Sequence, residues 1–132
     1  MAKTDTFVCS VVTPEGVVAE IEARFVVLPA HDGEIGVLHD RAPLLCKLDV
    51  GRLRIETPTE KLIFYVDGGV AEMVDNQLTI LTEDARRPDE LDREAAESGL
   101  SEAKLMSVTD DLSFQARQRA LKRARIQLRL LQ

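Results

Sequence analysis

The sequence has few of the residues from which disulfide frameworks, metal centres and membrane spans are built. Its 132 residues include only two cysteines and two histidines. Cys9 and Cys46 lie in apolar segments, where a free thiol usually packs as a small hydrophobic side chain, so we expect no disulfide and a reducing compartment. No apolar run approaches the roughly 18–20 residues of a bilayer-spanning helix, and MAKTDTF matches neither a signal nor a transit peptide. We therefore expect a soluble protein with one ordinary domain, or a small core with an appendage.

Acidic residues are missing from one end of the chain. All 23 lie at or before Asp111, and the segment 112–132 carries six positive charges and no negative ones. Residues 1–111 contain the other 11 basic residues (17 less these six) and all 23 acidic residues, so they carry a formal charge of −12. The net charge of −6 argues against nucleic acid as the main partner.

The first two thirds of the chain has the pattern of a β domain. Short Val-, Ile- and Leu-rich runs alternate with turn residues, which predicts an all-β antiparallel sandwich of about ten short strands over residues 1–86. Strict alternation over 52–56 indicates a half-buried strand. Asp75-Asn76 tolerates positive φ and favours a two-residue hairpin. Gly68-Gly69 indicates a bulge or a close backbone approach rather than a phosphate-binding loop.

Beyond residue 86 the pattern becomes helical, and residues 87–132 are predicted to form an α-helical hairpin. Asp89-Glu90-Leu91-Asp92 has the acidic character of a helix start, so a first helix is expected over 89–106. Asp110 or Asp111 is expected to cap a second helix, and one apolar seam repeats every seven residues along it at Phe114, Leu121 and Leu128. The first helix carries a charge of about −4 and the second +6, so an antiparallel pair is expected to attract weakly.

Two His-Asp pairs, His31-Asp32 and His39-Asp40, lie in the stretch LPAHDGEIGVLHDRAPLL, residues 28–45. They raise the possibility of a metal-dependent hydrolase. Such sites need three or four ligands with supporting hydrogen bonds, and both histidines come from one Gly-rich segment. A solvated polar loop is therefore the preferred interpretation, with no catalytic residues and no metal ligands assigned.

The same stretch carries a resemblance that extends over essentially the whole chain. Together with DVGRLRI at 49–55, DGGVAEM at 67–73 and QLTIL at 77–81, it is similar to the epsilon subunit of F-type ATP synthases. The resemblance implies a non-catalytic rotor subunit whose sandwich seats the central stalk on the c-ring and packs against gamma. It also implies a location on the cytoplasmic face of a bacterial membrane, or an organelle-encoded copy, held there through the complex.

The resemblance also assigns contact residues. Glu34 and Arg41 stand where family members approach the c-ring. Many members have histidine at the position of Arg41, and the arginine removes pH sensitivity there because it stays protonated where histidine would titrate. The helical hairpin is expected to be permissive when folded down and to inhibit ATP hydrolysis when extended. In the extended state its second helix would meet beta, and alpha, subunits of the catalytic head. The cations expected to make the beta contact are Arg117, Lys122, Arg123 and Arg125.

A nucleotide-sensing role is the remaining alternative. Some bacterial members bind ATP through a motif at the start of the first helix, which this chain matches at Leu91, Asp92 and Ala96. Ala95 replaces the arginine of that motif, so a phosphate would lose a bidentate donor. We expect weak or absent ATP binding and no other cofactor.

Overall fold

The computed structural model describes residues 5–132, so the predictions that involve residues 1–4 (the absence of a leader peptide and the first residues of the sandwich) lie outside the described residues. An eight-stranded sheet precedes two helices. In chain order the elements are β1 (Phe7–Thr13), β2 (Gly16–Ala23), β3 (Phe25–Ala30), β4 (Gly33–Leu38), β5 (Leu44–Glu56), β6 (Lys61–Val74), β7 (Gln77–Leu81), β8 (Ala85–Arg86), the 3-10 turn η1 (Pro88–Glu90), α1 (Arg93–Lys104) and α2 (Asp111–Leu130).

The predicted sandwich with a helical hairpin is confirmed, with two differences in the strands. Eight strands replace the expected ten or so, because β5 and β6 are single strands of 13 and 14 residues. The strand order is β2-β1-β7-β6-β5-β3-β4, with β8 paired to β6. Contrary to a purely antiparallel sheet, β1 runs parallel to β7. The alternation of apolar residues within each strand does not reveal this pairing, because β1 and β7 are far apart in the sequence.

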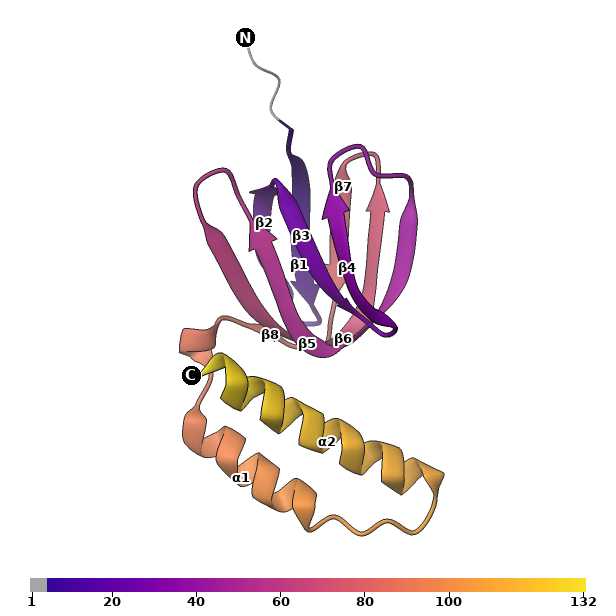
Figure 1. Cartoon of the computed structure of the whole chain (residues 1–132), viewed down its shortest axis with the longest axis vertical. Helices are drawn as coiled ribbons and strands as arrows, with labels where there is room; N and C mark the ends of the chain where they lie inside the picture. Colours follow the sequence, from indigo (N-terminus) through magenta and orange to yellow (C-terminus); the bar gives the residue numbers. More distant parts are fainter. Residues whose placement is uncertain (1–4) are drawn as a thin grey trace.

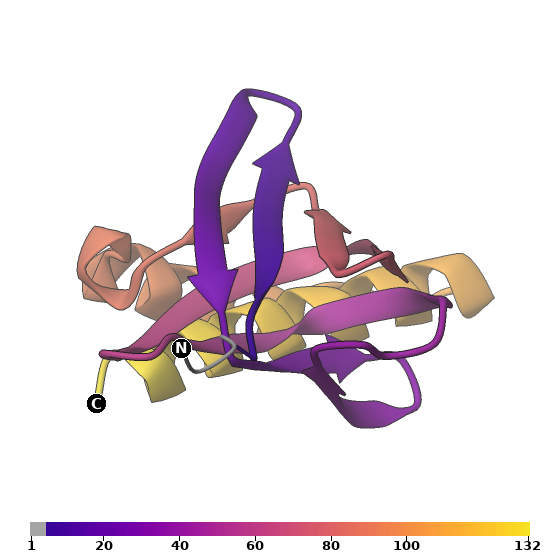
Figure 2. The same ribbon diagram turned by 90° about the horizontal axis from the view of Figure 1, so that it is seen from above.

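The two long strands bend where they pass beneath the sandwich. In Figure 1 β5 and β6 converge at the lower end of the β domain, directly above α2, while the β1–β2 hairpin stands away from the other strands in Figure 2. Glycines occupy both strands here: Leu48 pairs with Gly69, and Gly51 with Val66. The bend folds the sheet over a core built mostly from alternate strand residues, including Cys9, Leu28, Leu53, Ile55, Met73 and Ile80.

Both predicted backbone features of the β domain are confirmed. Asp75 and Asn76 have φ values of 49° and 61°, as a two-residue hairpin turn between β6 and β7 requires. Gly69 has a φ of +103°, and a Cβ there would lie 1.8 Å from the carbonyl oxygen of Leu81. Cys9 is fully buried and Cys46 partly so, both as free thiols.

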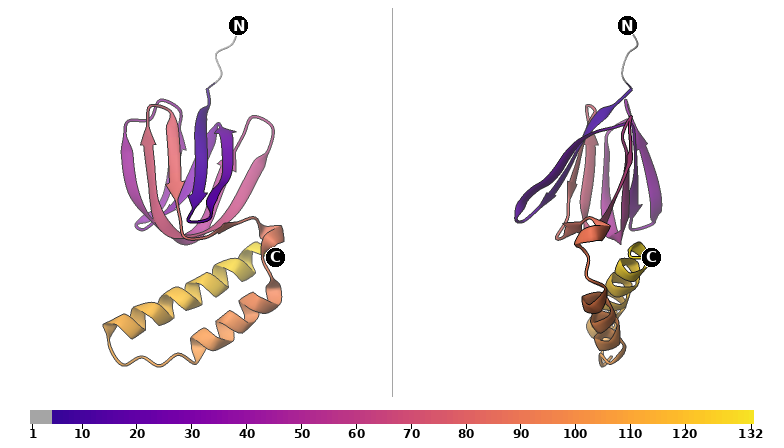
Figure 3. Two further views of the ribbon diagram at one scale, coloured as in Figure 1. Left: turned by 180° about the vertical axis from the view of Figure 1, so that it is seen from behind. Right: turned by 90° about the vertical axis from the view of Figure 1, so that its left-hand side faces the viewer.

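The helices begin later than the acidic residues suggest. Residues Pro88–Glu90 form the 3-10 turn, and Asp92 is the N-cap of α1, its carboxylate accepting a hydrogen bond from the Glu94 amide at 2.9 Å. Asp110 caps α2 in the same way through Ser113, which lowers the pKa of Asp110. The helices lie antiparallel beneath the sandwich (Figure 3), and each buries small or apolar residues against the other: Ala96, Ala103, Leu121 and Ala124. Neither helix combines the length and apolarity that a membrane crossing needs.

Candidate functional site

The face of α2 that meets the bend of β5 and β6 forms the most extensive contact between helix and sandwich. A small apolar cluster lies at its centre, with Val50 and Tyr65 from the strands and Leu91 from the linker buried together. Ile126, Leu130 and Leu131 of the C-terminal segment pack on it and remain partly exposed. This cluster is separate from the main core, so the helix rests on the sandwich without being part of its interior.

Two ion pairs flank this apolar cluster. The Lys122 ammonium lies 2.6 Å from Asp49 Oδ2, and Arg123 Nε donates to Asp67 Oδ2 at 2.8 Å. The Asp67 side chain is only 15% exposed. Its backbone amide donates to the hydroxyl of Thr82, a buried residue, at 3.1 Å, which fixes the strand beside it. We refer to Asp49, Asp67, Lys122 and Arg123 as the docking pairs.

The titration of groups in this seam follows from its partial burial. Burial alone would raise the pKa of Asp49, but the hydrogen bonds from Lys122 and the Val50 amide outweigh it and hold that pKa below its usual value. Burial raises the pKa of Tyr65, whose hydroxyl also shares a hydrogen bond with Gln127 of α2. Asp49 is therefore ionised at neutral pH, as its pairing with Lys122 requires.

The predicted attraction between the two helices takes a different form. In the part of the chain that the structure describes, every ion pair made by α2 runs to the sandwich, and none joins α1 to α2. Instead, two guanidinium groups donate hydrogen bonds to backbone carbonyls of the other segment. Arg93 donates to the carbonyl of Leu131 at 3.0 Å, and Arg117 donates to the carbonyl of Lys104 at 3.5 Å. The opposite signs of the two helices are as predicted, but α1 within its observed bounds carries only −1 (two basic and three acidic residues) because Asp89, Glu90 and Asp92 precede it, and α2 carries +5 (six basic residues and Asp111). Two of the cations of α2 pair with the sandwich instead.

The cations expected to meet a beta subunit are divided among three surroundings. Lys122 and Arg123 are held by the docking pairs, and Arg117 lies against the end of α1. Arg125 is exposed. While α2 lies on the sandwich, two of the four cations are therefore already paired with carboxylates of this chain.

Glu34 and Arg41 are not brought together. Glu34 is exposed near the start of β4 and lines a hollow with Arg129 of α2. Arg41 follows the other end of β4, past Asp40, which exchanges two hydrogen bonds with Asn76 of the β6–β7 turn. Leu38 lies four residue steps along the strand from Glu34, about 13 Å away, and Arg41 lies beyond it. The two residues therefore belong to opposite ends of the sandwich.

The two histidines are separated in the same way, which contradicts a metal site shared by them. His31 lies in the β3–β4 turn, whereas His39 follows β4 at its far end. Both ring nitrogens of His39 lie near carboxylates: Nδ1 is 3.1 Å from Asp40 Oδ2, and Nε2 is 3.8 Å from Asp5 Oδ1. Within residues 5–132 no three His, Cys, Asp or Glu side chains converge as metal ligands would.

The residues of the ATP motif have structural roles. Leu91 belongs to the apolar cluster, Asp92 caps α1, and Ala96 is buried against α2. A hollow of about 300 Å³ lies between the helices, and Arg123, already paired with Asp67, is the one cation in its wall. Its lining consists of Ala95, Ala96, Gly99, Glu102, Ala103, Met106, Ala120, Arg123, Ala124 and Gln127.

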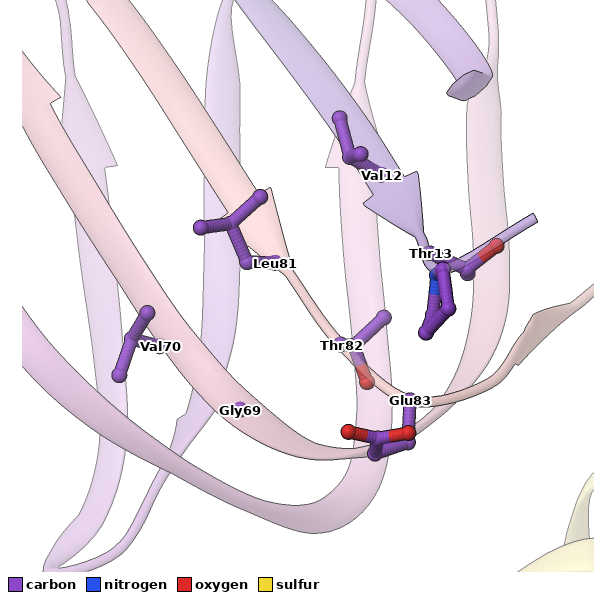
Figure 4. A pocket seen from close by; sticks show the side chains of 8 residues that line it. Val12, Thr13, Gly69, Val70, Leu81, Thr82 and Glu83 are labelled. Atoms are coloured by element: carbon purple, nitrogen blue, oxygen red, sulfur yellow. The ribbon is translucent and has the colours of Figure 1, made fainter. Parts of the chain in front are cut away.

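A second hollow, of about 380 Å³, lies on the sandwich where β1 ends beside β6 and β7 (Figure 4). Its wall is largely apolar, and Glu83 is its one titratable side chain. One carboxylate without a partner acid, base or nucleophile offers no catalytic arrangement. The lining residues are Val12, Thr13, Pro14, Gly69, Val70, Leu81, Thr82 and Glu83.

Sequence reasoning missed Asp49 and Asp67 as functional residues. Both belong to segments already noted for their glycines, DVGRLRI and DGGVAEM, and both are followed within two positions by glycine. The sequence signal that could have identified them is an acidic residue just before a glycine in each of two strand segments.

Three kinds of comparison bear on this chain. The family model described as "ATP synthase, Delta/Epsilon chain, beta-sandwich domain" matches residues 6–88. An ATP synthase epsilon chain of Rhodopirellula baltica is 41% identical over 121 residues, covering 92% of this chain and 94% of the relative. The epsilon chain of Synechococcus elongatus is 40% identical over 123 residues, covering 89% of each. A chloroplastic epsilon chain of Cyanidioschyzon merolae is 37% identical, covering 89% of this chain and 92% of the relative.

Two solved structures share the fold. A chain of the Euglena gracilis mitochondrial ATP synthase superposes with a TM-score of 0.85 at 20% identity, covering all of this chain and 85% of that one. A chain from the central stalk and c-ring structure of the Tetrahymena thermophila mitochondrial ATP synthase gives a TM-score of 0.76 at 16% identity, covering 99% of this chain and all of that one. In both, the likeness extends over sandwich and hairpin together.

Proposed function

Because this chain belongs to the epsilon-chain family of ATP synthases, we propose that it is a rotor subunit that couples ion flux through the c-ring to ATP synthesis and restrains ATP hydrolysis. It is an accessory subunit and not itself a catalyst. The observation that carries the proposal is its 41% identity to an epsilon chain over 92% of its length. The protein works peripherally to the membrane, on the cytoplasmic face in a bacterium, through the complex.

The sandwich is the part proposed to contact gamma and the c-ring. Glu34 and Arg41 lie at opposite ends of β4, so we assign them to two different contacts, with Glu34 meeting the ring beside the end of α2 and Arg41 contributing at the other end. This division replaces one ring-facing loop with two separated surfaces.

The helical hairpin is the proposed regulatory element. Its weak seat on the sandwich supports this role, since partly exposed ion pairs contribute about 0–1 kcal/mol each and the apolar cluster is small. Lys122 and Arg123 are needed both for docking and for the proposed beta contact. The two destinations of α2 therefore exclude each other, and an acidic surface on beta competes with Asp49 and Asp67.

A chain shortened to residues 1–87 is expected to keep its fold and its gamma contact. The main core draws on residues from Phe7 to Ala85, with no contribution from the hairpin. Loss of α1 and α2 exposes the small cluster around Val50 and Tyr65, so a modest loss of stability is expected. Co-purification of tagged full-length and shortened chains with gamma measures this. If neither chain associates with gamma, the rotor proposal is wrong; if only the shortened chain fails, the assignment of the contact to the sandwich is wrong.

ATP sensing is the weaker alternative, and we propose that the hairpin motif does not recognise adenosine. Calorimetric titration is expected to show ATP binding no tighter than inorganic triphosphate, because the hollow between the helices offers one cation that is already paired. Ala95→Arg, which restores the missing donor on an exposed position, is expected to favour ATP. A wild-type preference for ATP of tenfold or more over triphosphate would contradict this view.

A further inference from the structure

Beside the end of α2, a groove begins between the helix and the edge of the sandwich and continues along the surface of the helix. It consists of two hollows, of about 290 and 370 Å³, which share Ile126 and Arg129 in their walls. The first is also lined by Pro29 and Glu34 of the β3–β4 hairpin and by Arg52 of β5, and the second by Lys122 and Arg125. Sandwich and hairpin together line the first hollow, whereas the second is lined by α2 alone; we term the two adjoining hollows the seam groove.

The seam groove is positively charged on a chain whose net charge is −6. Arg52, Arg125 and Arg129 have no carboxylate within ion-pair distance anywhere in residues 5–132, whereas Lys122 is paired with Asp49. Glu34 supplies the one carboxylate of the lining. In the first hollow, Arg52 and Arg129 against Glu34 leave a formal charge of +1, and Arg125 adds one more positive charge in the second hollow, so the groove attracts anions.

The geometry favours a small oxyanion over a macromolecule. Guanidinium groups match the oxygens of phosphate with paired, charge-assisted hydrogen bonds. A hollow near 300 Å³ is at the lower limit for small-molecule sites and too small to seat a helix. We propose that the seam groove binds phosphate or pyrophosphate, with Arg52 of the sandwich and Arg129 of α2 holding the same anion.

This placement has a consequence for the hairpin. An anion that contacts Arg52 and Arg129 together is bound only while α2 lies on the sandwich, so its binding energy stabilises the docked state. The groove lies outside the hollow between the helices, since the two share no lining residue. Binding here does not depend on association with gamma, so the rotor proposal and this one can fail separately.

Calorimetric titration of the full-length protein with inorganic phosphate and with pyrophosphate tests the proposal. We expect saturable binding at one site, tighter for pyrophosphate. Arg52→Gln and Arg129→Gln should each weaken it about tenfold or more, because each removes a charge-assisted donor pair. Glu34→Gln should strengthen binding by removing a repelling charge. All three residues are exposed, and circular dichroism verifies that the variants fold.

The matched control is Arg119→Gln, which removes the same charge from the same helix but lies outside both hollows, near Gly68. Its affinity should stay within about twofold of the wild type. Pyrophosphate should also slow proteolysis of the segment between the sandwich and α1 in the wild type but not in Arg52→Gln. Absence of saturable binding, equal weakening in Arg119→Gln, or proteolysis that pyrophosphate does not slow in the wild type would overturn the proposal.

Discussion

Replacing Gly69 by alanine is expected to destabilise the sandwich by about 4 kcal/mol or more, a large part of the 5–15 kcal/mol that holds a typical domain folded. A Cβ at this position would lie 1.8 Å from the Leu81 carbonyl oxygen and 2.8 Å from its carbon. Both are backbone atoms of the strand region paired with β6, so relief requires the strands to separate. The φ of +103° adds strain for any L side chain. Urea unfolding monitored by circular dichroism measures the loss.

Two other glycines separate the steric cause from the conformational one. Gly33 has a φ of +125°, but a Cβ there meets nothing within 4 Å, so Gly33→Ala should cost only backbone strain, about 1–2 kcal/mol. Gly99 lies in α1 with open space around it, and Gly99→Ala should stabilise the helix by about 0.5–1 kcal/mol. Equal losses at positions 69 and 33 would show that the close approach of Leu81 contributes nothing.

These glycines illustrate which features of the fold could be predicted. The features at Gly68-Gly69 and Asp75-Asn76 depend on positive φ angles of single residues. The tolerance for positive φ follows from the residue type, so the bulge or close approach and the turn could be predicted. Helix limits were less accurate, because Asp89, Glu90 and Asp92 all resemble caps and only the backbone conformation selects Asp92. Pairing between distant strands, as in β1 with β7, leaves no such local trace.

The same distinction explains the candidate site. The cationic character of α2 could be counted from the sequence, but the partners of Lys122 and Arg123 depend on how the bend of β5 and β6 presents Asp49 and Asp67. The sequence favoured the acidic first helix as the partner of these cations, but their carboxylate partners belong to the sandwich. The division of Glu34 from Arg41 has a similar origin. The two residues are only seven positions apart in what looks like one loop, but Glu34 lies near the start of the extended strand β4 and Arg41 beyond its end.

Opposite changes to the docking pairs are expected to move ATP hydrolysis in opposite directions. Asp49→Asn with Asp67→Asn removes both acceptors of α2 and leaves its cations intact. If the two pairs together contribute about 1.4 kcal/mol, the released hairpin becomes roughly tenfold more populated, and a reconstituted ATP synthase should be inhibited more strongly. Replacing Arg117, Lys122, Arg123 and Arg125 by alanine also frees α2 from the sandwich, but it removes the charges proposed to bind beta, so inhibition should be relieved.

Proteolysis of the segment between the sandwich and α1 supplies a measurement that does not depend on the partner. Both sets of changes should increase its cleavage, because each breaks the same two ion pairs, while their effects on hydrolysis differ in sign. Arg119→Ala is the charge-matched control on α2, since Arg119 belongs to neither docking pair, and it should leave cleavage unchanged. If the aspartate variant releases the hairpin without increasing inhibition, docking and inhibition do not compete for Lys122 and Arg123. If neither variant alters cleavage, the ion pairs do not hold α2, and its seat depends on the apolar cluster of Val50, Tyr65 and Leu91 alone.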